Sequence, residues 1–313
     1  MSAPPTEHSA QAATDPRPAW FLEAIAHEPD VETVQVEGCD INVLAWGATT
    51  LPTLTLVHGG SAHAHWWNFI APLLATQHRV LALDLSGHGD SGHRDTYSAD
   101  LWAKEIITVS NEVGGTQAPI VAGHSMGGRI TSLVASEWGE RLAGAIIMDS
   151  RLWRWDPETE AARARPDANR QLTVYPDLET AVGRFRLLPA QACDNPWLLE
   201  HVARHSLKEV EGGWTWKFDP KLFSEASGPS PTRDFTPDFA GARCRVALIR
   251  GAWSEIADER TRAYMIDLLA RSPGSGRGVP FIEVPEARHH LMFDRPLALF
   301  TALQSVVGVW RAL

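Results

Sequence analysis

The sequence predicts an α/β fold: a mostly parallel eight-stranded sheet with helices on both faces and an inserted helical cap. Three observations lead there: unbroken apolar runs, amphipathic stretches between them, and one long interruption. Parallel strands covered by helices on both faces are apolar throughout rather than alternating. The runs are TLTLVHGG, RVLALDLSG, APIVAGHS and AGAIIMDS, followed late in the chain by CRVALIRG (244–251) and PFIEVPEA (280–287).

The first two strands differ from the rest. Residues 31–38 (VETVQVEG) alternate between apolar and polar side chains, as a half-exposed strand does, and residues 41–47 (INVLAWG) fit as the hairpin partner. The intervening Cys39 and Asp40 are the expected turn. Helices are expected between the strands, near 258–271, and from about 296 to the C-terminus.

Residues 151–240 interrupt this rhythm. They are rich in Trp, Pro and Arg, and their apolar positions mostly follow helical spacing. A segment inserted between one sheet strand and the next lies over the carboxyl edge of the sheet, where open α/β sheets bind ligands. We therefore predict a cap at 151–240, a core formed by 18–150 and 241–313, and a disordered tail at 1–17, which is polar and proline-rich.

The composition of the chain limits the classes of binding partner that we expect. The formal net charge is −10, and the chain has no basic block, which argues against nucleic acid and anionic membrane surfaces. A small-molecule substrate is expected, and homodimerisation stays open.

The cysteines are far apart, so neither a disulfide framework nor a zinc site is indicated, and we expect no metal and no cofactor. Without a signal peptide or a membrane-spanning run, we expect a cytoplasmic protein. The cysteines are Cys39, Cys193 and Cys244.

The motif GHSMGG (123–128) places Ser125 between a predicted strand and a predicted helix. This strand-to-helix turn is typical of a nucleophile elbow, in which the serine adopts a strained backbone conformation. The unpaired amides at the helix N-terminus, that of Met126 first, can face developing negative charge. Ser125 is therefore the predicted nucleophile.

A serine nucleophile needs a base and an orienting acid. The segment VPEARHHLMFDRP after the last strand offers His289 or His290 as the base. Glu255, at the turn after the preceding strand, is the favoured acid, whereas Asp258 is expected to cap the next helix. Asp149, at the end of the strand before the cap, is the alternative acid.

A second oxyanion donor is expected in the loop LVHGGSAHAHWW. We favour the amide of Gly60, because a residue without a side chain lets a substrate oxygen approach closely; Ser61 is its near neighbour. His58 is expected to brace the loop through hydrogen bonds.

With LVHGG, DLSGHGDSG (84–92), GHSMGG and the His289 loop in this order, residues 31–313 resemble the α/β-hydrolase fold superfamily. The resemblance implies a Ser–acid–His triad, assigns the base to His289 by position, and makes the 84–92 loop structural. Arg288 stands where the superfamily often has glycine, and Glu255 departs from the commoner aspartate. The structural loop residues it implies are Asp84, Gly87, Gly89 and Ser91.

Within that superfamily, Ser125 argues against haloalkane dehalogenases and epoxide hydrolases, which use an aspartate nucleophile. The resemblance implies a serine hydrolase that cleaves a carboxylic ester or lactone of a small, mainly hydrophobic substrate through an acyl-enzyme. Carbon–carbon hydrolases of aromatic degradation share S-M-G-G and are the first alternative; a ligand-binding protein with little turnover is the second. The residues expected to bind substrate are Trp67, His124, Trp153 and Trp155, and the arginines of 151–186 are candidates for binding a carboxylate.

Overall fold

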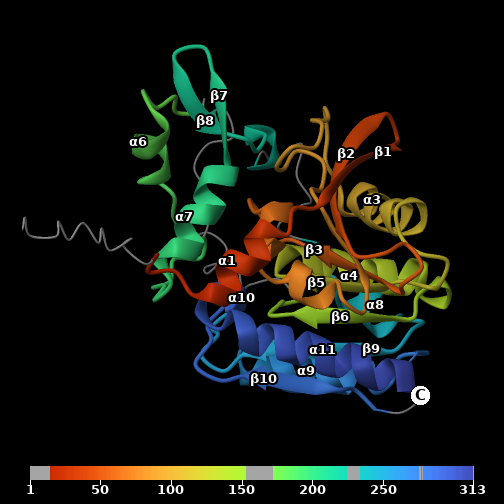
Figure 1. Ribbon diagram of the computed structural model, residues 1–313. Coiled ribbons are helices and arrows are strands. Elements are labelled where there is room, and N and C mark those ends of the chain that lie inside the picture. The colour runs from red at the N-terminus through yellow and green to blue at the C-terminus, as the bar shows by residue number, and fades with distance from the viewer. Residues whose placement is uncertain (1–14, 153–171, 224–232, 275, 277, 313) are drawn as a thin grey trace, which may run out of the picture.

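The protein is built on an eight-stranded sheet (Figure 1). The computed structural model describes residues 15–152, 172–223, 233–274, 276 and 278–312. Strands β3 to β10 of this sheet run parallel, and only the β1–β2 and β2–β4 pairs are antiparallel, so the predicted sheet is confirmed. In order across the sheet the strands are β1 (Asp30–Val36), β2 (Cys39–Trp46), β4 (Arg79–Leu83), β3 (Thr53–Val57), β5 (Ile120–His124), β6 (Gly144–Met148), β9 (Val246–Gly251) and β10 (Phe281–Val284).

The β1–β2 hairpin turns two residues earlier than the sequence predicted. Val36 pairs with Cys39, so Cys39 and Asp40 belong to β2 and the turn is Glu37–Gly38. Both turn residues have positive φ, 47° and 75°. Such turns match the twist of a hairpin, and a glycine adopts the left-handed conformation without steric cost.

Helices cover both faces of the sheet, and successive strand residues point to opposite faces. In β5, Ala122 joins one core and Val121 the other. One core includes residues of α1 (Ala19–Ala26), η1 (Ala64–Trp67), α2 (Ala71–Leu74), α10 (Leu291–Asp294) and α11 (Pro296–Ala312). The other includes residues of α3 (Ala99–Glu112), α4 (Met126–Glu137), α8 (Thr236–Ala240) and α9 (Glu259–Leu269), with η2 (Gly139–Arg141) following α4.

The segment between β6 and β9 contains short helices and a hairpin. Figure 1 shows α6, α7 and the hairpin projecting together from the rest of the molecule. The sequence predicted helices but not this hairpin, whose tight turn contains Gly212 with φ of 86°. Trp153 and Trp155 lie outside the described residues, as does most of the expected 1–17 tail. The elements are α6 (Leu178–Val182), α7 (Pro196–His205), β7 (Leu207–Val210), β8 (Gly213–Trp216) and η3 (Pro220–Phe223), followed by α8.

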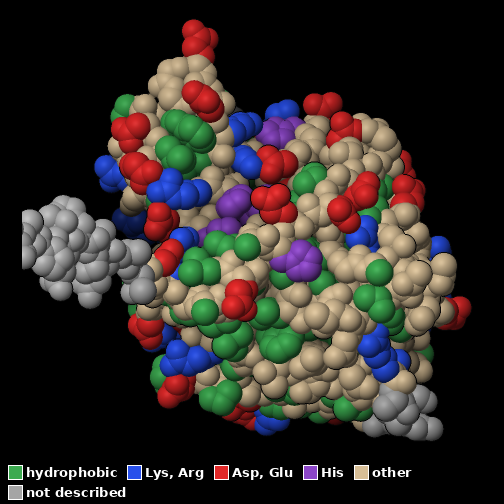
Figure 2. Space-filling model, viewed as in Figure 1, with side chains coloured by type: hydrophobic (Ala, Val, Ile, Leu, Met, Phe, Trp, Pro, Cys, Tyr) green, Lys and Arg blue, Asp and Glu red, His purple; other side chains and the backbone are tan. Residues whose placement is uncertain are grey.

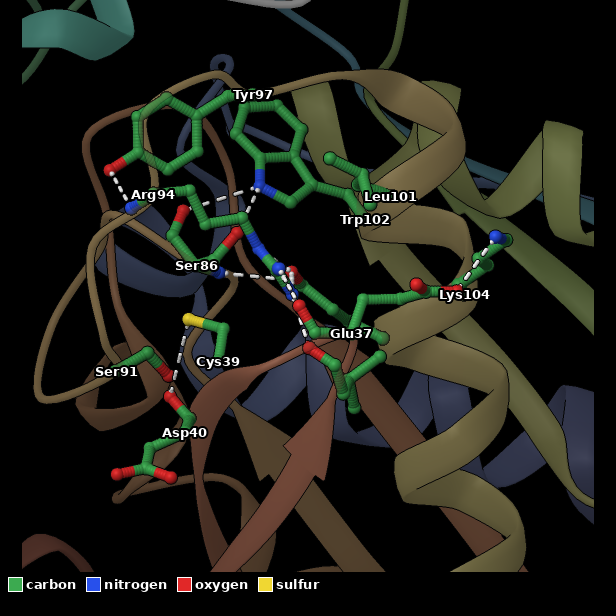
Figure 3. A network of polar contacts seen from close by, with 12 residues as sticks. Glu37, Cys39, Asp40, Ser86, Ser91, Arg94, Tyr97, Leu101, Trp102 and Lys104 are labelled. Carbon is green, nitrogen blue, oxygen red and sulfur yellow. Dashed lines mark hydrogen bonds and ion pairs between the residues drawn. The ribbon is translucent and has the colours of Figure 1, made fainter.

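A buried carboxylate ties α3 to the loop after β4 and to the first hairpin (Figure 3). Glu105 is fully buried, and burial raises the pKa of its carboxyl group. It accepts hydrogen bonds from the Ser86 amide at 2.9 Å and the Arg94 guanidinium at 2.9 Å, and Arg94 also donates to the Val36 carbonyl at 2.6 Å. This network holds the 84–92 loop in place.

The same loop anchors the segment that leads out of the projecting hairpin. Asp219 donates its amide to the Gly87 carbonyl at 2.8 Å, and its carboxylate accepts from the Tyr97 hydroxyl at 2.6 Å. Of the helices that the structure describes, none has both the length and the apolar character to cross a bilayer.

Candidate active site

The predicted nucleophile, the predicted base and the alternative acid lie at the carboxyl ends of neighbouring parallel strands. Ser125 directly follows β5, Asp149 directly follows β6, and His289 lies in the loop after β10. The loop that follows β3 begins at His58. Because β3, β5, β6, β9 and β10 are adjacent in the sheet, these segments meet at one edge although they are far apart in sequence.

His289 joins the serine to a carboxylate. Its Nε2 lies 3.0 Å from Ser125 Oγ, and its Nδ1 lies 2.8 Å from Asp149 Oδ1. His289 is 4% exposed and Asp149 1% exposed, whereas Ser125 is partly accessible. With Nδ1–H donated to Asp149, Nε2 is left to accept the serine proton, so the geometry is the one that a nucleophile, a base and an orienting acid require.

The preference for Glu255 as the acid was wrong, and the alternative, Asp149, occupies the position. Glu255 is exposed to solvent. The residue before it, Ser254, is the one that reaches the site, because its hydroxyl donates to Asp149 Oδ1 at 2.5 Å. Asp258 caps α9 as expected, accepting from the Thr261 amide at 2.7 Å. The loop after β9 therefore reaches the site through Ser254, but the carboxylate itself comes from the end of β6.

The turn at Ser125 has the strained geometry of a nucleophile elbow. Ser125 has φ of 55° and ψ of −117°, and its amide donates to the Met148 carbonyl at 3.0 Å. The glycines that follow permit close packing of this turn. A Cβ on Gly127 would overlap the His58 carbonyl oxygen, and one on Gly128 would overlap Ser150 Oγ.

The loop after β3 passes directly beside the nucleophile. A Cβ on Gly59 would lie 3.3 Å from the Ser125 Cβ. His58 braces this loop as predicted: its Nε2 accepts from the Leu85 amide at 3.1 Å, and its Nδ1 lies 2.7 Å from the Gly59 carbonyl oxygen. Burial lowers the pKa of His58 to about 4, in keeping with a neutral ring. Gly60, next in the loop, is partly exposed.

The first residue of α4 is Met126, so its amide lacks a partner within the helix. The amide of Met126, at the start of α4, and the amide of Gly60, one residue beyond Gly59, are the expected oxyanion donors. Their role as an oxyanion hole remains a prediction.

His124 does not have the position expected of a substrate-binding residue. It is buried behind the base, with Nε2 2.8 Å from the His289 carbonyl oxygen and its ring centroid 4.8 Å from that of His289. Burial holds the pKa of His124 well below its usual range. A side chain in this position orients His289 rather than contacting substrate.

Three buried histidines lie close enough together to share a metal ion. One nitrogen each of His124, His289 and His290 lie within 4.8 Å of one another. Both nitrogens of His289 are already within hydrogen-bond distance of Ser125 and Asp149, so a cation here would compete with the triad. We therefore assign the group to positioning of the His289 loop.

Trp67 does not line the site either. Its side chain is 0% exposed and belongs to the core on the face that carries α2 and α11. Helical spacing in η1 turns Trp67 inward, which the sequence alone did not show because the preceding loop could have presented either face.

Four further residues support the site, and the sequence analysis missed them. Ser254, which donates to Asp149, is the first, and Ser150 Oγ donates to the Ser125 carbonyl at 2.9 Å. Gln191 Oε1 accepts from the His290 amide at 2.9 Å, and Asn195 Nδ2 donates to the Phe293 carbonyl at 2.8 Å. Polar side chains of this kind carry no motif, so no local signal in the sequence identifies them.

The 84–92 loop is structural, as the resemblance implied. The Asp84 carboxylate accepts from the Ala64 amide at 2.6 Å and the Asp90 amide at 2.9 Å, and its burial raises its pKa to about 6. Because Ala64 starts η1, Asp84 fixes the end of the loop that contains Gly59 and Gly60.

Known proteins resemble this chain over most of its length. Esterase Rv0045c of Mycobacterium tuberculosis is 26% identical over 286 residues, which cover 89% of each protein. The 2-(acetamidomethylene)succinate hydrolase of Mesorhizobium japonicum is 23% identical over 265 residues, covering 82% of this chain and 88% of that protein. A crystal structure of an E-2-(acetamidomethylene)succinate hydrolase superposes with a TM-score of 0.75 at 19% identity, covering 90% of this chain and 99% of the other.

A family model supplies the assignment. The model of the Alpha/beta hydrolase family matches residues 56–303, which include Ser125, Asp149 and His289. The strand order and the site at the carboxyl edge agree with this match. The chain therefore belongs to the alpha/beta hydrolase family.

Proposed function

We propose that the protein is a serine hydrolase that cleaves a small carboxylic ester or lactone through an acyl-enzyme. One observation carries this proposal: His289 is hydrogen-bonded at the same time to Ser125 Oγ, at 3.0 Å, and to Asp149, at 2.8 Å. A serine hydroxyl is a poor nucleophile unless a neighbouring base accepts its proton. The resemblance to an esterase supports the hydrolytic chemistry.

In the first half of the reaction, Ser125 Oγ attacks the substrate carbonyl while its proton passes to His289 Nε2. The tetrahedral oxyanion is stabilised by the amides of Met126 and Gly60, and Asp149 stabilises the imidazolium. Collapse of the intermediate breaks the bond to the leaving oxygen, which takes the proton from His289.

In the second half, His289 accepts a proton from water, and the resulting hydroxide adds to the acyl carbonyl. Collapse releases the carboxylic acid and returns the proton to Ser125. A lactone follows the same steps, except that the leaving alcohol stays attached to the acyl group until water attacks.

Two measurements test this proposal. A fluorophosphonate probe should label Ser125 in the wild-type protein, and Ser125→Ala should abolish labelling. Hydrolysis of 4-nitrophenyl butyrate should fall by roughly three to six orders of magnitude in the same variant. The circular dichroism spectrum of Ser125→Ala should match that of the wild-type protein, because the substitution removes only a hydroxyl group. The loss of turnover then reflects the missing nucleophile and not a change in fold.

The two alternatives give different results in the same assays. A panel of simple esters, lactones and a vinylogous 1,5-diketone separates them. Cleavage of the diketone alone would identify a carbon–carbon hydrolase. Absence of both labelling and turnover would point to a ligand-binding protein.

A further inference from the structure

A cavity of about 240 Å³ lies between the loop after β3 and the projecting hairpin (Figure 2 shows the surface in the same orientation as Figure 1). It is of the size that holds a small molecule or one group of a larger one. Its walls come from three parts of the chain: the 61–63 segment, the 84–92 loop, and the segment between β6 and β9. Its described lining includes Ser61, His63, Arg184, Phe185, Arg186 and Trp216.

One short loop lies against the nucleophile and continues into the wall of the cavity. Gly59 lies against Ser125, since a Cβ added to this glycine would be 3.3 Å from the serine Cβ, and Gly60 follows it. Ser61, the next residue, is already part of the cavity wall. In the binding mode that this neighbourhood suggests, a substrate whose carbonyl oxygen is held by the Gly60 amide extends past Ser61 into this cavity.

Among the residues that the structure describes, the charged side chains that line the cavity are all basic: Arg184, Arg186 and Lys217. Lys217 is neutralised by Asp90, whose carboxylate lies 2.7 Å from Nζ. Arg186 donates to the Gly183 carbonyl at 2.9 Å and the Phe185 carbonyl at 2.6 Å. Within the described part of the chain, no carboxylate forms an ion pair with either arginine. Their positive charge is thus uncompensated by ion pairs there, in a protein with a net charge of −10.

The other described residues of the cavity wall are apolar or neutral. The rings of Phe185 and Trp216 lie 6.4 Å apart, and Phe218 and Leu188 add apolar surface. His63 Nε2 lies 2.8 Å from Ser206 Oγ, and burial keeps the pKa of His63 well below its usual range, so this pair is uncharged. The cavity therefore suits a short apolar chain that ends in an anion.

We propose that this cavity binds a carboxylate of the substrate through Arg184 and Arg186, so that the preferred substrates are esters with a short apolar chain and a terminal carboxylate. Guanidinium groups bind carboxylates through two parallel hydrogen bonds. The inference rests on the proposed ester hydrolysis and refines the mainly hydrophobic substrate that the sequence predicted.

The test compares monomethyl glutarate with methyl valerate, which have the same chain length and differ in the terminal carboxylate. Methanol release gives kcat/KM for each ester. We expect the wild-type protein to prefer monomethyl glutarate, and the ratio of the two kcat/KM values to fall roughly tenfold or more in the double variant Arg184→Met/Arg186→Met. Both arginines are exposed, so the double variant should fold.

Arg204→Met is the matched control. Arg204 also lies in the segment between β6 and β9, but it pairs with Glu179 and Glu200, at 2.9 Å each, and does not line the cavity. The ratio should stay at the wild-type value in this variant. The proposal would be overturned if the wild-type protein had a kcat/KM for monomethyl glutarate no higher than that for methyl valerate. It would also be overturned if the ratio fell equally in Arg204→Met and in Arg184→Met/Arg186→Met.

A binding measurement separates this inference from the proposed reaction. Calorimetry with Ser125→Ala, which cannot form an acyl-enzyme, should show tighter binding of monomethyl glutarate than of methyl valerate. Adding Arg184→Met/Arg186→Met should remove the difference. If the wild-type protein hydrolyses neither ester and this binding preference is present, ester hydrolysis is wrong and the carboxylate site stands. Equal binding of both esters refutes the carboxylate site.

Discussion

Asp149 Oδ1 lies 2.8 Å from His289 Nδ1, and Asp149 makes two further hydrogen bonds. Oδ1 also accepts from the Ser254 hydroxyl at 2.5 Å, and Oδ2 accepts from the Gly251 amide at 2.8 Å. These donors come from the end of β9 and the turn after it. The carboxylate is therefore held in one orientation, which in turn fixes the ring of His289.

Replacing this carboxylate should disable the base. We expect Asp149→Asn to lower kcat on a reactive ester on the order of 10³- to 10⁴-fold, because the amide favours the wrong tautomer of His289. Glu255→Gln is the control and should change kcat by less than about twofold, since Glu255 is an exposed side chain. A large loss in Glu255→Gln with little loss in Asp149→Asn would contradict the assignment.

The contact between Gly128 and Ser150 predicts a sensitive position behind the nucleophile. In Gly128→Ala the new methyl group would overlap Ser150 Oγ, so we expect about 1–3 kcal/mol of destabilisation and a lower kcat. Urea unfolding and ester turnover measure the two effects.

Two variants complete that experiment. Gly308→Ala in α11 meets no atom within 4 Å and should be neutral or stabilising by up to about 1 kcal/mol. Combining Gly128→Ala with Ser150→Gly should recover part of the stability, because the clashing hydroxyl is gone. If Gly128→Ala behaves like Gly308→Ala, the close contact is not real.

The buried ion pair between Arg94 and Glu105 (Figure 3) predicts that a substitution far from the candidate active site has a large effect on stability. Arg94→Met leaves the buried Glu105 carboxylate without its cation, and we expect the free energy of unfolding to fall by about 3–5 kcal/mol. Lys104→Met removes an exposed pair with Glu37 and should cost about 0–1 kcal/mol. Denaturant unfolding checks both. Equal effects of the two substitutions would show that burial of Glu105 does not matter.

Buried neutral histidines predict a loss of stability in acid. Burial lowers the pKa of His58 and His78 to about 4 and that of His290 to about 3. Well above a pH of about 6.5 these rings are neutral in both the folded and the unfolded chain, so they add no pH dependence. Between about pH 6.5 and 4 only the unfolded chain takes up protons, so the free energy of unfolding falls by roughly 1.4 kcal/mol per pH unit for each ring.

His78 offers a test of this linkage away from the active site. His78→Gln removes one of the groups that take up a proton on unfolding. The free energy of unfolding, measured with urea across about pH 4 to 8, should therefore fall less steeply below about pH 6.5 than in the wild-type protein. Parallel curves for the two proteins over that range would contradict the expected shift.

Local sequence was enough to predict the sheet, and it also selected Ser125 and His289, whose side chains lie 3.0 Å apart in the structure. Apolar runs mark buried parallel strands, and the glycines around Ser125 mark a strand-to-helix turn, because both signals depend on neighbouring residues. His289 could be placed because it follows the last strand. The β1–β2 turn was misplaced by two residues, since the positive φ of Glu37 leaves no trace in its residue type.

Only the tertiary structure decided between Asp149 and Glu255. Both follow strands that end at the same edge, so chain order allowed either; the direction of a side chain in a loop depends on contacts from elsewhere. Ser254 turns toward Asp149, and its neighbour Glu255 is left in solvent. The same holds for Trp67 and His124. Their residue types suggested that they bind substrate, but packing places Trp67 in the core and His124 behind His289. The sequence indicated which kinds of side chain to expect at the site, and long-range packing decided which of them come together.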